Sequence, residues 1–327
     1  MRLLLLLVVL RAGCGERDED FVFFGPPGES PYFDRLSAAE NAELQRACGR
    51  RTGGRRLAIE NGDYAAAGDV PWAASVSASS RVELNNRCGA TIISPRHLLT
   101  ATHCFFDYAS KTVPCSGPSL KRDFDALKVS FGGVCLRADA AVGCECRDVQ
   151  TARLRRLAIL RSFHDAACEG GNDLAILELS ADIRFDEHTQ PVCLLNGSRL
   201  SPDSRTDGLQ ERVHSLESFG WGMDYTETYP SRLRHFFSRF YEWQPAGGAD
   251  ILRLQSVARS SICSGDSGAG AVAVERRTNR SVLLGVHSYS EKCARGKTAP
   301  SDFYVVTSVH EHREQICFIT GVCPEAV

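Results

Sequence analysis

The hydrophobic pattern from Ile59 onward consists of short apolar or alternating runs separated by turn residues. The segment LKVSF (127–131) alternates with a period of two, which is the spacing of a half-buried β-strand. Comparable runs recur at 72–78, 90–94, 153–163, 174–180 and 282–290. Many short strands with few helices are typical of antiparallel barrels and sandwiches, so the pattern predicts an all-β fold.

Helical spacing occurs near the two ends of the chain. Ser37 and Glu40 have the spacing of a capping box, which predicts a helix that begins there. Residues 307–319 place apolar or half-polar side chains three or four positions apart, which predicts a C-terminal helix (Val309, His312, Ile316, Ile319).

The N-terminus has the features of a secretory signal peptide over residues 1–13. Arg2 precedes an apolar run from Leu3 to Leu10, and small residues come after it. The run is much shorter than the roughly 20 residues that a membrane-spanning helix needs. We therefore expect a secreted, extracellular protein and no membrane partner.

Residues 14–58 differ in composition from the rest of the chain and are expected to form a pro-segment. The stretch 16–35 is acidic and contains a Pro-Pro-Gly turn, which predicts an extended or loosely ordered chain. The basic, glycine-rich stretch 49–56 is typical of an exposed linker that proteases can reach.

Composition excludes some partners and fixes the redox setting. The chain has 327 residues, of which 43% are hydrophobic, and a net charge of −2, so no overall field favours nucleic acid. Fourteen cysteines indicate an oxidising compartment. If Cys14 is lost with the signal peptide, thirteen remain, and one thiol is free or bonded to another chain.

Three residues in separate motifs form a candidate catalytic set. Ser267 lies in CSGDSGAG, His103 in LLTATHC and Asp173 in GGNDLAILEL. Taken alone, each has a structural explanation as a turn residue or a buried histidine. Together they stand in the order His, Asp, Ser, which is one of the chain orders of a serine hydrolase triad.

These motifs and their flanks make the chain resemble the trypsin/chymotrypsin-like (S1) serine proteases over roughly residues 59–310. The helix lead-in LSAAENAELQRACG is similar to that of secreted nematode members. The resemblance implies two packed antiparallel β-barrels with a C-terminal helix in residues 59–327. The matching segments are 68–76, 88–104, 172–179, 190–194, 219–222, 263–268 and 287–290.

The resemblance also implies roles for these residues in the hydrolysis of protein or peptide substrates. Ser267 is expected to be the nucleophile, His103 the general base and Asp173 its buried partner. The backbone N–H groups of Gly265 and Ser267 are expected to form the oxyanion hole. No cofactor and no metal are implied.

Disulfide pairing is implied in part by the same resemblance. It implies the bonds Cys88–Cys104 and Cys263–Cys293, and a bond between Cys48 and Cys193 that ties the pro-segment to the protease domain. Cys317 and Cys323 are near enough in sequence to pair. The remaining cysteines stay unassigned (Cys14, Cys115, Cys135, Cys144, Cys146, Cys168).

A zinc site is the competing interpretation for some of these cysteines. Its ligands would come from a short stretch in the middle of the chain (Cys144, Cys146, His164, Cys168). The spacing matches no known zinc pattern, and the compartment is oxidising, so we expect disulfides there instead.

Activation is where the chain departs from the family pattern. The resemblance implies that a new N-terminus at Ile59 pairs with Asp266, but Ile59 follows Ala58 and not a basic residue. Cleavage at Arg56–Leu57 would leave two extra residues ahead of Ile59. Both bonds, Arg56–Leu57 and Ala58–Ile59, stay open as the activation site.

The expected specificity pocket has mixed features. Ser261 lies six residues before Ser267, at the position of the pocket floor, and favours a neutral substrate side chain. Asp302 would restore a preference for basic residues if it enters the same pocket. Ser288 and Ser290 are expected to form the wall and to pair with substrate backbone, with Ser290 narrowing the slot.

Further expectations concern modification, partners and alternative functions. Asn196 and Asn279 begin glycosylation tripeptides. A zymogen requires an activating protease, and inhibitors of the serpin or Kunitz type are possible partners. The main alternative is a catalytically silent, protease-like binding or regulatory protein. An α/β-hydrolase is disfavoured because Ala269 replaces the last glycine of its Gly-x-Ser-x-Gly elbow.

Overall fold

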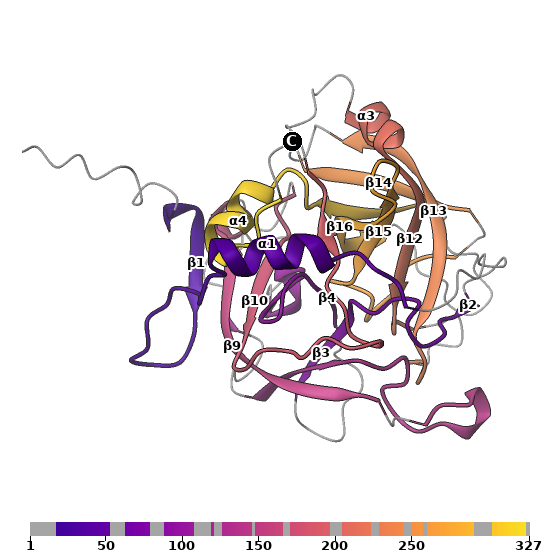
Figure 1. The fold of residues 1–327 in the computed structure, drawn as a ribbon, viewed down its shortest axis with the longest axis horizontal. Helices are drawn as coiled ribbons and strands as arrows, with labels where there is room; N and C mark the ends of the chain where they lie inside the picture. The colour runs from indigo at the N-terminus through magenta and orange to yellow at the C-terminus, as the bar shows by residue number, and fades with distance from the viewer. Residues whose placement is uncertain are drawn as a thin grey trace, which may run out of the picture.

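The structure is a computed structural model in which most of the chain is described. The described residues are 18–52, 63–78, 88–107, 119–120, 126–145, 148–165, 171–196, 205–223, 229–244, 250–257, 260–290 and 303–324. Two β-barrels lie side by side, with the N-terminal half of the chain in one and the C-terminal half in the other (Figure 1).

Six strands close the first barrel. They lie next to one another in the order β9–β10–β5–β4–β3–β8, and β8 pairs back onto β9. Leucine and isoleucine side chains fill the interior, and Leu98, Leu99 and Leu157 have no exposed surface. The strands are β3 (Ala73–Ala78), β4 (Cys88–Ile92), β5 (His97–Thr100), β8 (Leu127–Phe131), β9 (Gln150–Leu160) and β10 (Ala175–Leu179).

The second barrel has the same construction in the order β16–β15–β12–β13–β14–β17, closed by pairing of β17 with β16. Short strands extend it at β2 (Asp63–Tyr64) and β11 (Cys193–Leu194). Its strands are β12 (Val213–Gly220), β13 (Arg234–Gln244), β14 (Ile251–Ser256), β15 (Gly270–Glu275), β16 (Ser281–Ser290) and β17 (Phe303–Ser308). The predicted all-β fold of two antiparallel barrels is thus confirmed.

The C-terminal helix is present but shorter than the spacing predicts. It is α4 (Arg313–Thr320), whereas the apolar spacing begins at residue 307. Thr307 and Ser308 instead end β17, where they pair with Ile251 and Gly285. Strand pairing on both sides therefore delays the helix by six residues. The other helices of the described chain include the short α2 (Arg161–Asp165) and α3 (Arg205–Arg212).

The sequence predicts extended or loosely ordered chain for residues 16–35, and part of this segment is an extended, paired strand. After a 3-10 turn, η1 (Asp18–Asp20), the strand β1 (Phe21–Phe24) pairs antiparallel with β9. β9 is long enough for this because β8 pairs only with its first residues, up to Arg153. The edge from Leu157 to Leu160 is left over, and β1 covers it.

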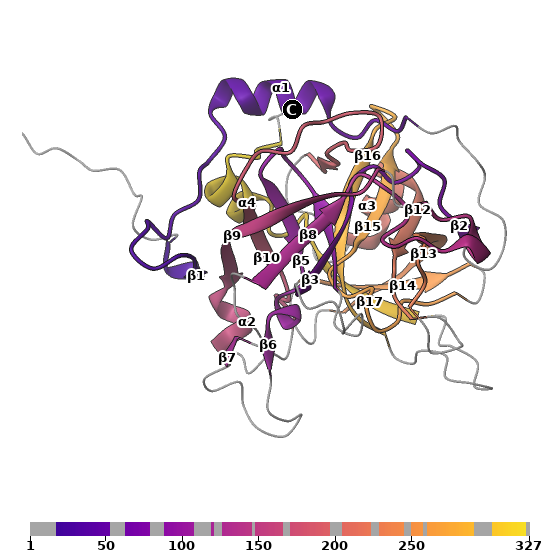
Figure 2. The ribbon, with the colours of Figure 1, turned by 90° about the horizontal axis from the view of Figure 1, so that it is seen from below.

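The predicted helix near residue 37 is α1 (Ala38–Ala47), and both bonds of its capping box are present. The Glu40 side chain accepts from the Ser37 N–H at 2.7 Å, and the Ser37 hydroxyl accepts from the Glu40 N–H at 3.2 Å. α1 lies beside α4 and the residues after α4 in both views (Figures 1 and 2). The side chain of Asn41 exchanges two hydrogen bonds with the backbone of Cys323, at 2.8 and 3.0 Å.

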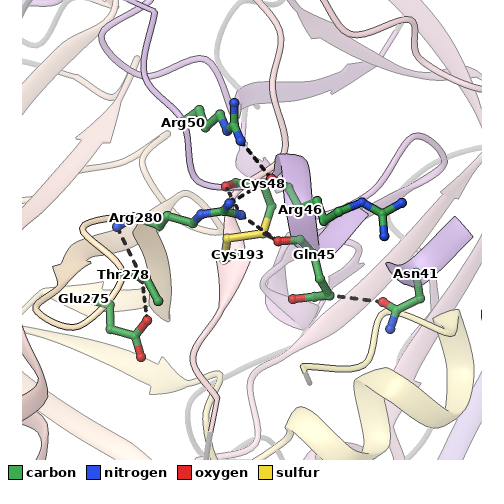
Figure 3. Close-up of a disulfide and its surroundings, with 9 residues drawn as sticks. All are labelled: Asn41, Gln45, Arg46, Cys48, Arg50, Cys193, Glu275, Thr278 and Arg280. Atoms are coloured by element: carbon green, nitrogen blue, oxygen red, sulfur yellow. Dashed lines mark hydrogen bonds between the residues drawn. A yellow bond between two sulfur atoms is a disulfide. The ribbon is translucent and has the colours of Figure 1, made fainter. Parts of the chain in front are cut away.

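The end of α1 is fixed to the second barrel in two ways (Figure 3). Cys48 forms a disulfide with Cys193, across 145 residues of sequence. The guanidinium of Arg280 donates to the carbonyl oxygens of Gln45, Arg46 and Cys48, at 2.6, 2.8 and 3.3 Å. A cation at the C-terminal end of a helix satisfies free carbonyls and complements the helix dipole.

Arg51 extends this attachment into the second barrel, contrary to the expectation of an exposed linker from residue 49. Its guanidinium forms an ion pair with buried Glu217, which also contacts His235. It donates to the Ser281 hydroxyl at 3.2 Å and lies over the ring of Trp72. Burial opposes ionisation of Glu217, but hydrogen bonding from His235 and the charge of Arg51 outweigh it and lower the Glu217 pKa.

Further disulfides staple the domain. Cys88 is bonded to Cys104 and Cys317 to Cys323, as expected from the sequence. Cys135 and Cys144, which the sequence left unassigned, are bonded to each other. Cys263 is disulfide-bonded, and its predicted partner Cys293 lies outside the described residues, as do Cys14, Cys115, Cys146 and Cys168. None of the helices in the described ranges has the length and apolar character needed to cross a membrane.

Candidate active site

Strand register brings His103 and Asp173 together. β10 runs antiparallel to β5 and pairs Ala175 with Thr100. Asp173 lies just before Ala175, and His103 lies just after Thr100, so the two residues extend from the same end of the strand pair. Two segments that are 70 residues apart in sequence thus meet at one end of the first barrel.

The 3-10 turn η3 (Thr102–Cys104) carries His103 and is anchored to the start of β10. The Thr102 hydroxyl donates to the carbonyl oxygen of Leu174 at 2.9 Å. The backbone N–H of His103 donates to Oδ1 of Asp173 at 3.0 Å. These two contacts fix the His103 backbone relative to Asp173 independently of the contact that the His103 ring makes.

Oδ2 of Asp173 lies 2.6 Å from Nδ1 of His103. Burial opposes ionisation of Asp173, but the charge of His103 and hydrogen bonds from His103 and Ser288 outweigh it and lower the Asp173 pKa. An ionised carboxylate only accepts hydrogen bonds, so Nδ1 carries the proton of the neutral ring. Nε2 is then the nitrogen that can take a proton from a nucleophile. The His103 side chain is 30% exposed, which leaves the ring accessible.

The Ser288 hydroxyl makes a contact that the sequence did not predict. It donates to Oδ2 of Asp173 at 2.6 Å, so the side chain supports the acid. β16 ends at Ser290 and carries Ser288 to the boundary between the barrels, where Asp173 lies. The HSYS motif identified this segment, but a serine hydroxyl gives no sequence signal for which acceptor it will find.

Ser267 lies in the turn before β15, and this turn packs against the first barrel. The Ser267 carbonyl oxygen accepts the N–H of Gly89 at 2.7 Å, and Sγ of Cys104 lies 3.8 Å from the same oxygen. Cys104 follows His103 directly in the chain. The three residues of the predicted triad are thus brought to one junction between the barrels.

Glycines make this close approach possible. A β-carbon on Gly89 would lie 2.4 Å from that of Ala269, and one on Gly268 would lie 2.2 Å from Oγ1 of Thr100. Gly268 also has φ of +83°, which side chains other than glycine rarely adopt. Any larger residue at these positions would push the Ser267 turn away from the first barrel.

Gly265, the expected oxyanion residue, is constrained by its own loop. Its φ is +101°, and a β-carbon there would lie 2.8 Å from Cε1 of Tyr229. The expected oxyanion role of Gly265 concerns its backbone N–H. Backbone conformation and the Tyr229 ring add a local reason that operates without substrate.

The Asp266 carboxylate turns away from solvent and is held by two backbone donors. Oδ1 accepts from Gly222 at 2.7 Å and Oδ2 from Cys263 at 2.9 Å. Burial raises the pKa of Asp266 to about 6, against the two backbone hydrogen bonds and the charge of Arg234. The group is therefore a desolvated carboxylate that a cation would stabilise.

Other predicted residues fall in three groups. The Ser261 hydroxyl is buried without a hydrogen-bond partner among the described residues, and Ser290 ends β16. Asn279 is exposed in a turn with φ of +56°, while Asn196 is half-buried and its carbonyl oxygen accepts from Arg212. Ile59 and Asp302 lie outside the described residues.

The residues weighed as zinc ligands do not form a cluster in the described structure. Cys144 is bonded to Cys135, so its sulfur is not free to bind metal. His164 lies next to Asp165, with Nδ1 3.0 Å from Oδ1. The described part of the chain contains no group of three histidine, cysteine or acidic side chains arranged to hold an ion.

Two closed barrels that meet at a histidine, an aspartate and a serine define the chymotrypsin-like class of proteins. Residues 59–311 match the model of the trypsin family. This match covers well over half of the sequence, and the chain therefore belongs to the trypsin family of serine proteases, whose substrates are proteins.

The curated relatives come from several animals. The chain is similar to trypsin-like protease try-5 of Caenorhabditis elegans, with 25% identity over 277 residues that cover 76% of this chain and 82% of that protein. It is 27% identical to serine protease filzig of Drosophila melanogaster over 76% of this chain and 14% of that protein. For mannan-binding lectin serine protease 1 of Mus musculus the identity is 25%, over 81% and 35% of the two chains. The chain thus spans only part of the latter two.

Proposed function

We propose that the protein is a secreted serine endopeptidase that hydrolyses peptide bonds through an acyl-enzyme. The pairing of His103 with Asp173 carries the proposal, with Nδ1 and Oδ2 2.6 Å apart at the junction where the Ser267 turn packs. A buried acid, an accessible ring and an adjacent serine are the parts that nucleophilic catalysis requires.

In the proposed reaction, Oγ of Ser267 attacks the substrate carbonyl carbon while Nε2 of His103 takes its proton. Collapse of the tetrahedral intermediate breaks the C–N bond, and His103 gives the proton to the leaving amine. Water then hydrolyses the ester by the same route. Asp173 holds the Nδ1–H tautomer, and the N–H groups of Gly265 and Ser267 stabilise the oxyanion.

We propose that activation requires a cut between Thr52 and Asp63. Both ends of this stretch are fixed, because the Thr52 hydroxyl contacts the Glu187 carbonyl oxygen and Asp63 pairs with His235 in β13. The tether Cys48–Cys193 would keep residues 14–58 attached after the cut.

The position of β2 favours insertion of the new N-terminus at Asp266. Tyr64 pairs with Arg234, which pairs in turn with Gly220, and a β-carbon on Gly220 would touch the Asp266 carboxylate at 2.0 Å. Ile59 is four residues from Asp63, a reach of about 13 Å in extended chain. Leu57 is six residues from Asp63, a reach of about 20 Å. N-terminal sequencing of the active form is the measurement that separates the two cleavage sites.

For specificity, we propose a pocket that takes a neutral side chain. The buried, unpartnered hydroxyl of Ser261 supports this, because it offers a hydrogen bond but no charge. Competition between peptide substrates with Phe, Leu, Lys or Arg before the cleaved bond tests it. A clear preference for Lys or Arg would assign the pocket to Asp302 instead.

The setting that we propose is extracellular. Disulfides join distant parts of the described chain, and Asn279 is exposed in a surface turn where a glycan has room. Expected partners are an activating protease and inhibitors of the serpin or Kunitz type. Mass spectrometry of protein from a secreting host would test glycosylation at Asn279 and Asn196.

A fluorophosphonate probe tests the proposed activity directly. Wild-type protein, Ser267→Ala and Ser264→Ala are treated with activating proteases, the cut is verified, and the probe is added. We expect labelling of wild type and of Ser264→Ala, an exposed serine of the same loop, and none of Ser267→Ala. No labelling of verified cleaved wild type would instead favour a protease-like binding or regulatory protein.

A further inference from the structure

Asp250 is a buried acid next to the turn that leads into Asp173. It lies just before β14, is only 3% exposed, and belongs to the second barrel. Its Oδ2 accepts the backbone N–H of Asn172 at 2.8 Å. Asn172 directly precedes Asp173 in the chain, so one carboxylate contacts the peptide unit before the catalytic acid.

The turn that Asp250 contacts has an unusual backbone. Gly171 has φ of +96° and Asn172 has φ of +62°, so two consecutive residues are left-handed. For a non-glycine residue this conformation costs about 1 kcal/mol or more, and surrounding contacts must maintain it. A β-carbon on Gly171 would lie 2.1 Å from Oδ1 of Asp250, so the shape of the turn and the position of the acid fit each other.

His312 in turn holds Asp250. Nε2 of His312 lies 2.7 Å from Oδ2 of Asp250. An ionised carboxylate only accepts hydrogen bonds, so Nε2 is the donor in this contact. Nδ1 of the same ring lies 2.7 Å from Oε1 of Gln315. His312 is the N-cap residue of α4, so the C-terminal helix fixes the ring in place.

The contact between Asp250 and Asn172 joins two parts of the chain whose relative position matters for catalysis. Asn172 and Asp173 lead into β10 of the first barrel, which also carries His103. Asp250 and its backbone partner Ser308, whose N–H donates to the Asp250 carbonyl oxygen at 2.6 Å, belong to the barrel that carries Ser267. The contact therefore crosses the boundary between the barrels close to the acid.

We propose that Asp250, oriented by His312, is a positioning residue for the catalytic acid. Its carboxylate holds the left-handed Gly171–Asn172 turn and so presents Asp173 to His103. This inference rests on the proposed protease function, and it concerns the orientation of Asp173, not the binding of substrate.

The predicted effect falls on kcat. A small displacement of a catalytic group lowers the rate much more than it weakens substrate binding, so we expect Asp250→Ala to lower kcat about 10- to 100-fold with KM within about twofold. Asp250→Asn keeps the shape of the side chain and one oxygen that can accept from Asn172 and His312, so we expect a smaller loss of kcat. Asp186→Ala is the matched control, because Asp186 also caps a turn by accepting two backbone N–H groups, but it follows the C-terminal end of β10, whereas Asp173 precedes the N-terminal end of that strand.

The decisive measurement is a double-mutant cycle in the activated enzyme. If Asp250 acts through Asp173, Asp250→Ala lowers kcat in wild type but adds less than about twofold in an Asp173→Asn background. An equal loss in both backgrounds overturns the proposal. An unchanged kcat in folded Asp250→Ala also overturns it.

A second readout does not depend on turnover. The proton between Nδ1 of His103 and Asp173 lies in a short hydrogen bond, which gives a low-field proton resonance in NMR spectra. We expect Asp250→Ala to shift or broaden this resonance and Asp186→Ala to leave it unchanged. If wild type is inactive but shows the resonance, the protease proposal fails while this comparison still decides the role of Asp250. Should Asp250→Ala not fold, Asp250→Asn is measured in both experiments, and a wild-type kcat and resonance in that variant overturn the proposal.

Discussion

Asp266 and Gly222 form a contact that admits no other residue at position 222. Oδ1 of Asp266 accepts the Gly222 N–H at 2.7 Å, and a β-carbon on Gly222 would lie 2.3 Å from the Asp266 carboxyl carbon. The serine turn and the segment after β12 are therefore coupled. A displacement of the Asp266 carboxylate is therefore expected to affect its chain neighbours Gly265 and Ser267.

Gly222→Ala is expected to disrupt this coupling. The added methyl group must displace the carboxylate or the backbone, and overpacking of this kind costs about 1–3 kcal/mol. We expect a lower free energy of unfolding in urea and, after activation, at least tenfold slower fluorophosphonate labelling. Gly25→Ala is the control, since the nearest atom to its β-carbon would be Cγ of Arg156, at 3.3 Å, which requires only a small shift. Normal labelling of Gly222→Ala would show that the carboxylate can move without affecting the serine turn.

The contribution of Asp266 to the stability of the uncut protein is expected to fall as pH rises from about 4 to about 6. Burial raises the Asp266 pKa to about 6. In that interval the folded protein holds a proton on Asp266 that the unfolded chain has lost, so raising the pH favours unfolding. The contribution amounts to at most about 3 kcal/mol and is constant above pH 6.

Urea unfolding of the Ser267→Ala protein across this range, with and without Asp266→Asn, checks the pH prediction. The difference in stability between the two proteins should change between pH 4 and pH 6 and then level off. A difference that stays constant with pH would show that Asp266 already has a compensating cation before cleavage.

The barrels and the candidate residues that meet at their junction could be predicted from the sequence because both depend on local patterns. Alternating runs identify strands, and each triad residue lies in a short motif with its own neighbours. The register that places Asp173 beside His103 is then a result of strand pairing. The role of Ser288 was not predictable in this way, because a hydroxyl on a strand end gives no indication of whether it faces a pocket or a carboxylate.

Removing the Ser288 hydroxyl is expected to reduce the contribution of Asp173 to catalysis without abolishing it. Ser288→Ala deletes one of three hydrogen bonds to Asp173, a loss of about 1–2 kcal/mol that corresponds to roughly 5- to 30-fold in kcat. The pKa of Asp173 should rise toward its usual value, because one of the groups that lowers it is gone. Activity against pH in the activated enzyme measures both effects, and Ser264→Ala is again the control. A wild-type rate in Ser288→Ala would assign this serine to substrate contact alone.

The N-terminal segment is held more firmly than its composition alone indicates. Its acidic, proline-containing composition is typical of loose chain, yet Phe21–Phe24 form a strand and Arg51 enters a buried ion pair. The composition of a segment indicates only how much apolar surface that segment can bury by itself. Here the buried surface belongs to β9, α4 and β12, which the segment meets only in the folded protein.

We predict that this segment stays bound after cleavage even without its disulfide. The contacts of β1, α1, Arg280 and Arg51 are noncovalent and extensive, and they do not depend on sulfur. Cys48→Ser combined with Cys193→Ser, cut in the linker and passed over a size-exclusion column, should elute as one complex of two chains. Separation of the chains would show that the disulfide alone retains the segment.

Arg280→Ala in the same double-serine background is the sharper variant. It removes the guanidinium that donates to three carbonyl oxygens at the end of α1, so we expect the segment to dissociate more readily at raised salt or temperature. Arg276→Ala, an exposed arginine on the same turn, should not have this effect.

The contacts of the α1 segment with the C-terminal end of the described chain also set the order of events during biosynthesis. Leu36 and Asn41 bind the backbone of Thr320 and Cys323, which are made near the end of synthesis, and β1 can pair only after β9 has been made. The segment can reach its final place only after synthesis of the whole chain, in the compartment where Cys48 can be oxidised. A nascent chain cut early in the linker would lose its N-terminal part before anything holds it, so under the proposed activation the cut must come after folding for the two chains to stay together.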